Sequence, residues 1–172
     1  MLYGCENVFD QVGSLGHYFN PSSTLEYKLG LAGSNYELTA SIPHVLSYFG
    51  GKGCLKNSFD TIAAHEEALA DILLSHLKSR GDVTIYGEPV ADRKLRVPTI
   101  SFTINGQSSK AIVAKVEQTS NFGFRFGAMY SNRLVHEILG LDDEGPVRIS
   151  MVHYNTSRQS FPWPYNLIRA TY

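Results

Sequence analysis

Apolar residues at helical spacing predict a helix that begins at Asn35 and ends at the glycine pair Gly50-Gly51. Glycine is common at this position because it adopts the left-handed conformation that stops a helix. Pro43 lies inside the run, so we expect it to bend or interrupt the helix, since proline lacks the N–H that the helix needs. The apolar positions recur every three or four residues: Leu38, Ile42, Val45, Leu46 and Phe49.

A longer helix is predicted directly afterwards. Asn57 or Ser58 provides an N-cap, and Asp60 lies in the first turn, where the helix dipole favours negative charge. Gly81 follows the expected end. At about 22 residues this helix spans about 33 Å at 1.5 Å per residue, long enough to connect two domains. Its predicted buried stripe consists of Phe59, Ile62, Ala63, Leu69, Ile72, Leu73 and Leu77.

After Gly81 the pattern changes to short elements. Period-2 alternation predicts strands, and capped stretches with helical spacing predict helices between them. The resulting order β-β-α-β-α-β indicates a small mixed sheet with helices packed on it, an α/β or α+β module. The predicted strands are 83–86, 99–104, 122–126 and 147–152, and the predicted helices are 108–118 and 132–139.

Composition narrows the class of protein. The chain has 172 residues, 43% of them hydrophobic, which suits a folded domain with a core. Fifteen basic and 16 acidic residues give a net charge of −1 without a basic cluster, so we expect no nucleic-acid partner. No apolar run suits a membrane span, and Cys5 and Cys54 have neither metal nor redox spacing. These features favour a soluble, cytoplasmic protein without a metal site.

Arg148 is the residue of the last predicted strand whose chemistry is least expected there. Val147, Ile149 and Met151 alternate with it, as in a half-buried strand. A guanidinium is costly to bury unpaired, so it should reach water or bind an anion such as a carboxylate. The simpler explanation is an ion pair with one of the nearby acidic residues Asp142, Asp143 and Glu144.

Four stretches, in matching order, resemble the C-terminal part of class V aminotransferase-type enzymes. These enzymes depend on pyridoxal 5'-phosphate and have fold type I, and the cysteine-desulfurase-like subgroup is the most similar. The resemblance implies a small C-terminal domain joined by a long helix to part of a large domain. The stretches are residues 25–37, 124–130, 140–150 and 153–156.

The resemblance assigns a cofactor-binding role to the first stretch. In the family, a hydroxyl residue in this segment contacts the cofactor phosphate of the neighbouring subunit, so the role falls on Ser34, flanked by Gly33 and Asn35. The resemblance therefore also implies a homodimer. A glycine turn, a hydroxyl and a helix N-terminus together suit an anion. The alternative is that Ser34 or Asn35 only caps the helix.

The later stretches imply the substrate-side residues. Arg125 begins a segment similar to the family's mobile active-site loop, and Arg148 takes the position that binds the α-carboxylate of an amino-acid substrate. Tyr130 falls where true cysteine desulfurases carry the cysteine that accepts sulfur. A tyrosine cannot hold a persulfide, so cysteine desulfurase activity is not expected.

The chain departs from the family at both ends. The family's lysine, which binds the cofactor covalently, lies shortly before the equivalent of Met1, and Pro162 and Pro164 replace a regular helix near the other end. We therefore expect a fragment, with residues 1–55 as a remnant of the large cofactor-binding domain and 56–172 as connecting helix and small C-terminal domain. No catalytic residue is assigned, and the chain alone is expected to be inactive. The alternative function is a non-catalytic interaction or regulatory module derived from the same fold.

Overall fold

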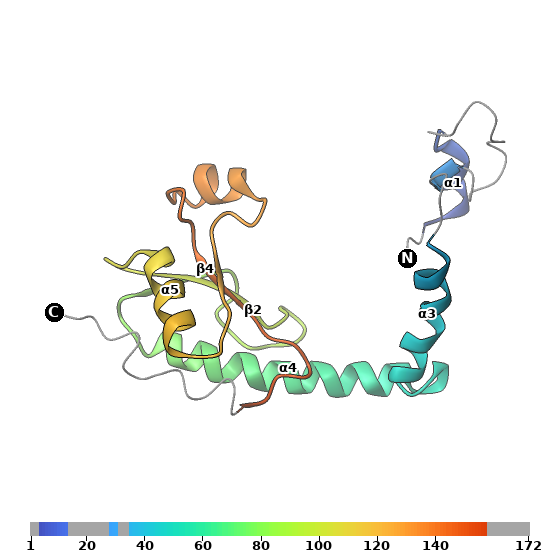
Figure 1. The fold of residues 1–172 in the computed structure, drawn as a ribbon, viewed down its shortest axis with the longest axis horizontal. Coiled ribbons are helices and arrows are strands. Elements are labelled where there is room, and N and C mark those ends of the chain that lie inside the picture. The colour runs from blue at the N-terminus through green and yellow to red at the C-terminus, as the bar shows by residue number, and fades with distance from the viewer. Residues whose placement is uncertain (1–3, 14–27, 31–34, 158–172) are drawn as a thin grey trace. The chain divides into compact units, whose positions relative to one another are not determined.

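The computed structural model describes residues 4–13, 28–30 and 35–157 (Figure 1). The chain divides into two compact units, Met1–Leu55 and Lys56–Tyr172. Whether the first unit corresponds to the large cofactor-binding domain of the family stays a prediction. In the part of the chain that the structure describes, no helix has the length and apolar composition needed to cross a membrane.

The first unit contains the helices α1 (Glu6–Gln11) and α3 (Tyr36–Tyr48) and the short helix η1 (Lys52–Cys54). Asn35 caps α3, because its side-chain oxygen accepts a hydrogen bond of 2.8 Å from the backbone N–H of Leu38. The helix runs through Pro43 without interruption, so the expected break is wrong. Proline removes one backbone hydrogen bond, and the turns on either side of it are sufficient to continue the helix.

The end of α3 agrees with the prediction. Gly50 has a φ of +81°, and Gly51 donates its N–H to the carbonyl oxygen of Leu46 at 2.7 Å. Only a residue without a Cβ adopts this conformation cheaply. No residue of α3 is buried, so its apolar stripe lies exposed.

The helix α4 (Leu55–Lys78) begins two residues earlier than the first predicted cap. The chain enters it directly from η1, so Asn57 and Ser58 lie inside its first turn and not at its N-cap position. Burial is confined to its second half, and Phe59 is 52% exposed, contrary to the predicted stripe. The buried residues are Leu69, Ala70, Leu73, Leu74 and Leu77.

The remaining elements form a four-stranded sheet with the order β1-β2-β4-β3. Every pair of neighbouring strands is antiparallel, so the sheet is not mixed as expected, while the predicted fold class of helices on a small sheet is confirmed. β4, the last strand along the chain, lies between β2 and β3. The elements are β1 (Val83–Tyr86), β2 (Thr99–Ile104), α5 (Ser109–Thr119), β3 (Arg125–Phe126), η2 (Arg133–Ile138) and β4 (Val147–Ser150).

Two predicted elements differ from the structure. The third strand is limited to Arg125–Phe126, the two residues that pair with Arg148 and Val147 of β4. The predicted α-helix at 132–139 is a π-helix, in which Leu139 donates its N–H to the carbonyl oxygen of Leu134, five residues back. Periodicity in so short a segment does not distinguish these two helix types.

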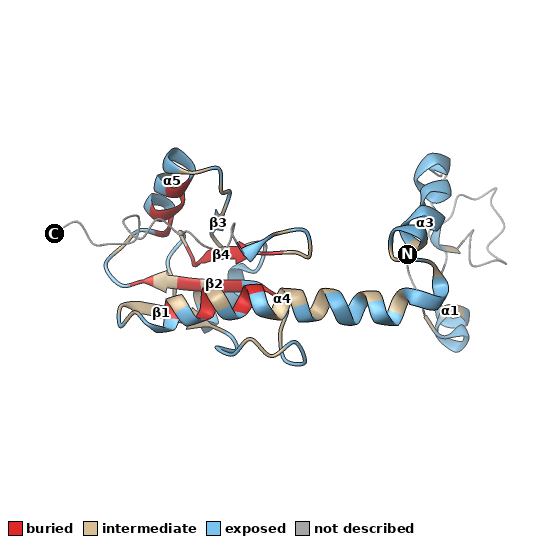
Figure 2. Ribbon diagram, turned by 90° about the horizontal axis from the view of Figure 1, so that it is seen from below, coloured by how far each residue is buried: buried red, intermediate tan, exposed pale blue. Residues whose placement is uncertain are grey.

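The core of the second unit lies between one face of the sheet and the helices α4 and α5. Buried residues gather on β2, β4, α5 and the second half of α4 (Figure 2). Phe102, Leu74 and Val147 are each 0% exposed. Alternation places the apolar residues of each strand on this face, so the polar residues must share the other.

The core predicts a clear contrast between two positions on α4. Leu74→Ala should lower the free energy of unfolding by about 2–5 kcal/mol, because it leaves a cavity in a fully buried site. Phe59→Ala, on the same helix but 52% exposed, should change it by no more than about 0.5 kcal/mol. Chemical denaturation followed by circular dichroism measures both, and equal losses would contradict the assigned core.

Candidate functional site

The face of the sheet opposite the core is polar. Strand register places Tyr86, Ser101, Arg148 and Arg125 side by side in one row across the four strands. Side chains directly opposite one another in antiparallel strands point to the same side. We call this row and its same-face neighbours the polar face; the neighbours are Thr84, Thr99, Thr103 and Ser150.

Hydroxyl groups pair with one another on the polar face. The Tyr86 hydroxyl lies 3.0 Å from Oγ1 of Thr103. Oγ1 of Thr99 donates to Oγ of Ser150 at 3.2 Å. These contacts satisfy neutral hydroxyl groups of the polar face. They provide no negative charge to balance Arg125 and Arg148.

Arg148 lies half-buried at the centre of the row. Its Nε is buried and has no hydrogen-bond partner among the residues that the structure describes. Leaving such a donor unpaired costs about 1–3 kcal/mol, and more when the group is charged. A site that holds an anion would satisfy it.

The acidic residues near Arg148 in sequence have other contacts. Asp142 accepts a hydrogen bond from the backbone N–H of Glu144 at 3.1 Å, and Asp143 lies 3.9 Å from Nε2 of His136. Glu144 accepts from Oγ of Ser108 at 2.6 Å. Among the described residues, none of the three forms an ion pair with Arg148, so the simpler explanation of this arginine is not what the structure shows.

Arg125 lies directly opposite Arg148, on the edge strand β3. Its side chain is exposed, and no ion pair to it is found among the described residues. Two like charges facing each other across a strand pair destabilise the sheet unless a counter-ion lies between them. The arrangement therefore favours an anion at this end of the polar face.

The segment after β3 has an unusual backbone. Met129 and Tyr130 have φ values of +50° and +65°, a conformation that non-glycine residues seldom adopt. The side chain of Tyr130 is fully exposed. Strain of this kind often accompanies binding loops. The loop that the sequence assigns to the active site is thus locally strained and open to solvent at Tyr130.

Backbone contacts close the base of this loop. The N–H of Gly127 donates to the carbonyl oxygen of Pro146 at 3.2 Å. Gly145 has a φ of +56°, and a Cβ there would lie 2.8 Å from the carbonyl carbon of Gly127. Gly145 must therefore be glycine, both for its conformation and for the close approach of the two chain segments.

Glu144 connects the same loop base to the N-terminus of α5. Its carboxylate accepts hydrogen bonds from Oγ of Ser108 and, at 3.4 Å, from the backbone N–H of Lys110. The Ser108 hydrogen bond is the main reason that the pKa of Glu144 lies below its usual range. Ser108 also caps α5 by accepting from the N–H of Ala111 at 3.1 Å.

The predicted cofactor segment belongs to the first unit. Gly33 and Ser34 lie outside the described residues, so their proposed phosphate contact is untested. For Asn35 the capping alternative holds, since its side-chain oxygen accepts from the N–H of Leu38. Sequence reasoning assigned no role to Tyr86 and Ser101, whose place beside Arg148 depends on strand register.

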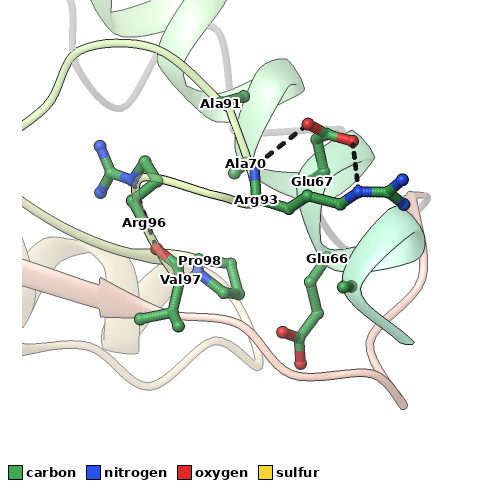
Figure 3. Close-up of a pocket in the computed structure, with 9 residues that line it drawn as sticks. Glu66, Glu67, Ala70, Ala91, Arg93, Arg96, Val97 and Pro98 are labelled. Carbon is green, nitrogen blue, oxygen red and sulfur yellow. Dashed lines mark hydrogen bonds and ion pairs between the residues drawn. The ribbon is translucent and has the colours of Figure 1, made fainter. Parts of the chain in front are cut away.

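A small pocket of about 70 Å³ lies elsewhere, between α4 and the connection from β1 to β2 (Figure 3). Oε1 of Glu67 accepts from the backbone N–H of Arg93 at 3.1 Å, and the guanidinium of Arg96 donates to the carbonyl oxygen of Thr99 at 2.6 Å. Burial lowers the pKa of Arg96. Ordinary ligand sites have volumes of about 300–1,000 Å³, and the volume of this pocket is far smaller, so no function is assigned to it.

The fold and the polar face define a helix-covered antiparallel sheet with two arginines that form no ion pair to any described residue. Comparison with known proteins identifies the family. Residues 6–159 match the aminotransferase class-V family, and the chain belongs to that family. The predicted resemblance is therefore confirmed. This family depends in general on pyridoxal phosphate.

Three curated relatives agree with this assignment. Aminotransferase-like protein FGM3 of Gibberella zeae is 47% identical over 156 residues, covering 91% of this chain and 38% of the relative. Nonribosomal peptide synthetase-like enzyme fsqF of Aspergillus fumigatus is 33% identical over 158 residues, covering 90% of this chain and 10% of the relative. Cysteine desulfurase-like protein ustD of Aspergillus flavus is 31% identical over 158 residues, covering 90% and 35%. The chain thus spans well under half the length of each relative.

The loop base predicts a difference between two glycines that both have positive φ. Gly106→Ala should cost about 1–2 kcal/mol of folding free energy, the usual cost of a left-handed non-glycine residue, because nothing lies near its Cβ. Gly145→Ala should cost about 1–3 kcal/mol more, since its Cβ would overlap the backbone of Gly127. Denaturant titration compares them, and equal losses would show that the close contact is absent.

Glu144 predicts a pH-dependent effect on stability. Its pKa is lower in the folded state, so its stabilising contribution is present above the unfolded-state pKa and is lost as the pH falls through the lowered value. Glu144→Gln should therefore be less stable than the wild type near neutral pH and match it in acid. Glu117→Gln on α5 is the control. A stability gap for Glu144→Gln that persists unchanged at low pH would contradict the assigned charge effect.

Proposed function

We propose that this chain forms the substrate-side region of a pyridoxal-phosphate-dependent enzyme that acts on an amino acid. The observation that supports this most is the buried, unpartnered Nε of Arg148 on the polar face. Family membership adds the cofactor class and the type of substrate. A purely structural or regulatory module would leave that guanidinium without a purpose.

Arg148 binds the α-carboxylate of the substrate in this proposal. Its planar fork can donate two parallel hydrogen bonds to one carboxylate, which fixes the direction of the amino acid as well as its position. The central strand β4 holds the arginine, and hydrogen bonds to β2 and β3 on both sides limit its movement. Rigid placement of this kind orients the bond that reacts.

Arg125 and Tyr130 belong to the loop that closes the site. The backbone of Arg125 is held in the sheet by strand pairing of β3 with β4, opposite Arg148, whereas the side chain of Tyr130 is fully exposed. Closure would bring Tyr130 over the substrate and exclude water from it. A phenol cannot carry a persulfide, so we propose an amino-acid reaction other than desulfuration.

Pyridoxal phosphate, when bound, supplies the electron sink for the reaction. We propose that the segment Gly33, Ser34 and Asn35 contributes to binding its phosphate, from the neighbouring subunit of a cytoplasmic homodimer. The N-terminus of α3 follows this segment, and its free N–H groups suit an anion. The Asn35 side-chain oxygen is engaged with Leu38, so the Ser34 hydroxyl is the better candidate.

The first functional prediction concerns the isolated 172-residue chain. It should show no amino-acid turnover with added pyridoxal phosphate, because none of its lysines matches the family position that binds the cofactor covalently. Visible absorbance, borohydride trapping and peptide mapping test this. One lysine labelled stoichiometrically, together with turnover, would contradict the prediction.

The second functional prediction concerns Arg148 in a complete enzyme that carries this region. Arg148→Lys should lower kcat/KM for the amino acid by about 10- to 100-fold, since a charge-assisted bond of this type is worth about 1.5–3 kcal/mol. An ammonium keeps the charge and loses the fork. Arg80→Lys is the matched control, because Arg80 pairs with Asp82 at 2.5 Å. Unchanged kcat/KM with a lower melting temperature would assign Arg148 a structural role instead.

A further inference from the structure

The charge on the polar face has one sign. All eight side chains that register assigns to this face are arginine, serine, threonine or tyrosine. Two of them, Arg125 and Arg148, are cationic and none is acidic. The strand pairing therefore places two positive charges on the polar face and, among the side chains that register assigns to it, no negative charge.

The other described arginines all have partners. Arg80, Arg93 and Arg133 each form an ion pair, with Asp82, Glu67 and Glu137 respectively. Arg96 donates to the backbone carbonyl oxygens of Val97 and Thr99. Within the described part of the chain, the two arginines of the polar face are thus exceptional, and they are cross-strand neighbours.

The spacing of the two arginines limits what can neutralise them. Directly opposite residues of an antiparallel pair have Cα atoms about 4.5–5.5 Å apart, so their guanidinium groups can approach one small ligand together. A single carboxylate carries one charge and leaves the second arginine unbalanced. Two carboxylates separated by two or three carbon atoms balance both.

We propose that the substrate is an amino acid whose side chain carries a second anionic group, such as a carboxylate. This inference rests on the proposed function. Arg148, half-buried on the central strand, receives the α-carboxylate that all amino acids share. Arg125, exposed on the edge strand next to the loop, receives the side-chain anion and determines specificity.

Tyr86 and Ser101 fit this division of roles. They lie in the same row on the side of Arg148 away from Arg125. Their hydroxyl groups are neutral and accept or donate hydrogen bonds, so they can contact a ligand without attracting a second charge. The anionic side chain is therefore directed towards β3 and not towards β1.

The test is a comparison of acid and amide substrates with the complete enzyme that contains this region. L-aspartate and L-glutamate differ from L-asparagine and L-glutamine in charge while keeping nearly the same shape. The wild type should use an acid with a kcat/KM at least about tenfold above its amide, since a charge-assisted pair is lost with the amide. Arg125→Gln should bring this ratio close to one, and Arg125→Lys should restore part of it.

Two controls separate a specific effect from general damage. Arg133→Gln removes a different exposed arginine of the same region and should leave the acid-to-amide ratio unchanged. Melting curves of all variants show whether they fold. The proposal is overturned if the wild type uses amides as well as acids, or if Arg125→Gln keeps the preference. Turnover without preference refutes only this inference, whereas no turnover of any amino acid refutes the proposed function and this inference with it.

Discussion

The pairing register of β4 is the constraint on which the second unit depends. β4 hydrogen-bonds to both β2 and β3, so its register determines which side chains of the three strands share one face of the sheet. In this register Val147 and Ile149 enter the core and Arg148 faces the opposite side. A shift by one residue would bury the guanidinium in the core and expose both aliphatic side chains. The register that packs Val147 and Ile149 into the core therefore also places Arg148 on the polar face.

The same pairing also determines where the loop after β3 begins. β3 has only two residues, and both pair with β4. Immediately beyond them, Gly127 lies against Gly145 and donates to Pro146, while Glu144 reaches the first turn of α5. The loop thus starts from a point held by the sheet and a helix together. Arg125 is positioned by this base, and the residues with positive φ, Met129 and Tyr130, lie further along the loop.

Family membership and geometry support each other at different levels. The class V aminotransferase family gives the general chemistry, namely a pyridoxal cofactor and an amino-acid substrate. Geometry supplies what the family alone does not, because it shows which guanidinium groups lack partners among the described residues. The family resemblance predicts that Tyr130 takes the position where true cysteine desulfurases carry a cysteine, and this assignment stays a prediction.

Much of the fold could be predicted from sequence, because its signals are local. Alternation identified β1, β2 and β4, the serine before α5 identified its cap, and glycine ended α3. Errors arose where an element depends on its neighbours. Phe59 has helical spacing, yet it is 52% exposed, and only two residues of the third strand pair with β4. Pro43 was expected to break a helix that in fact continues.

The candidate site also has features that the local sequence predicts and features that depend on neighbouring elements. Sequence by itself determined that Arg148 lies in a half-buried strand and that Arg125 precedes a loop, since each statement concerns one residue and its near neighbours. That Tyr130 takes the position of the desulfurase cysteine stays a prediction from the family resemblance. Only the tertiary structure decided that Arg125 and Arg148 face each other and that the nearby acids are engaged elsewhere. Register joins residues far apart in the chain, and no local pattern records which residues of two strands will meet.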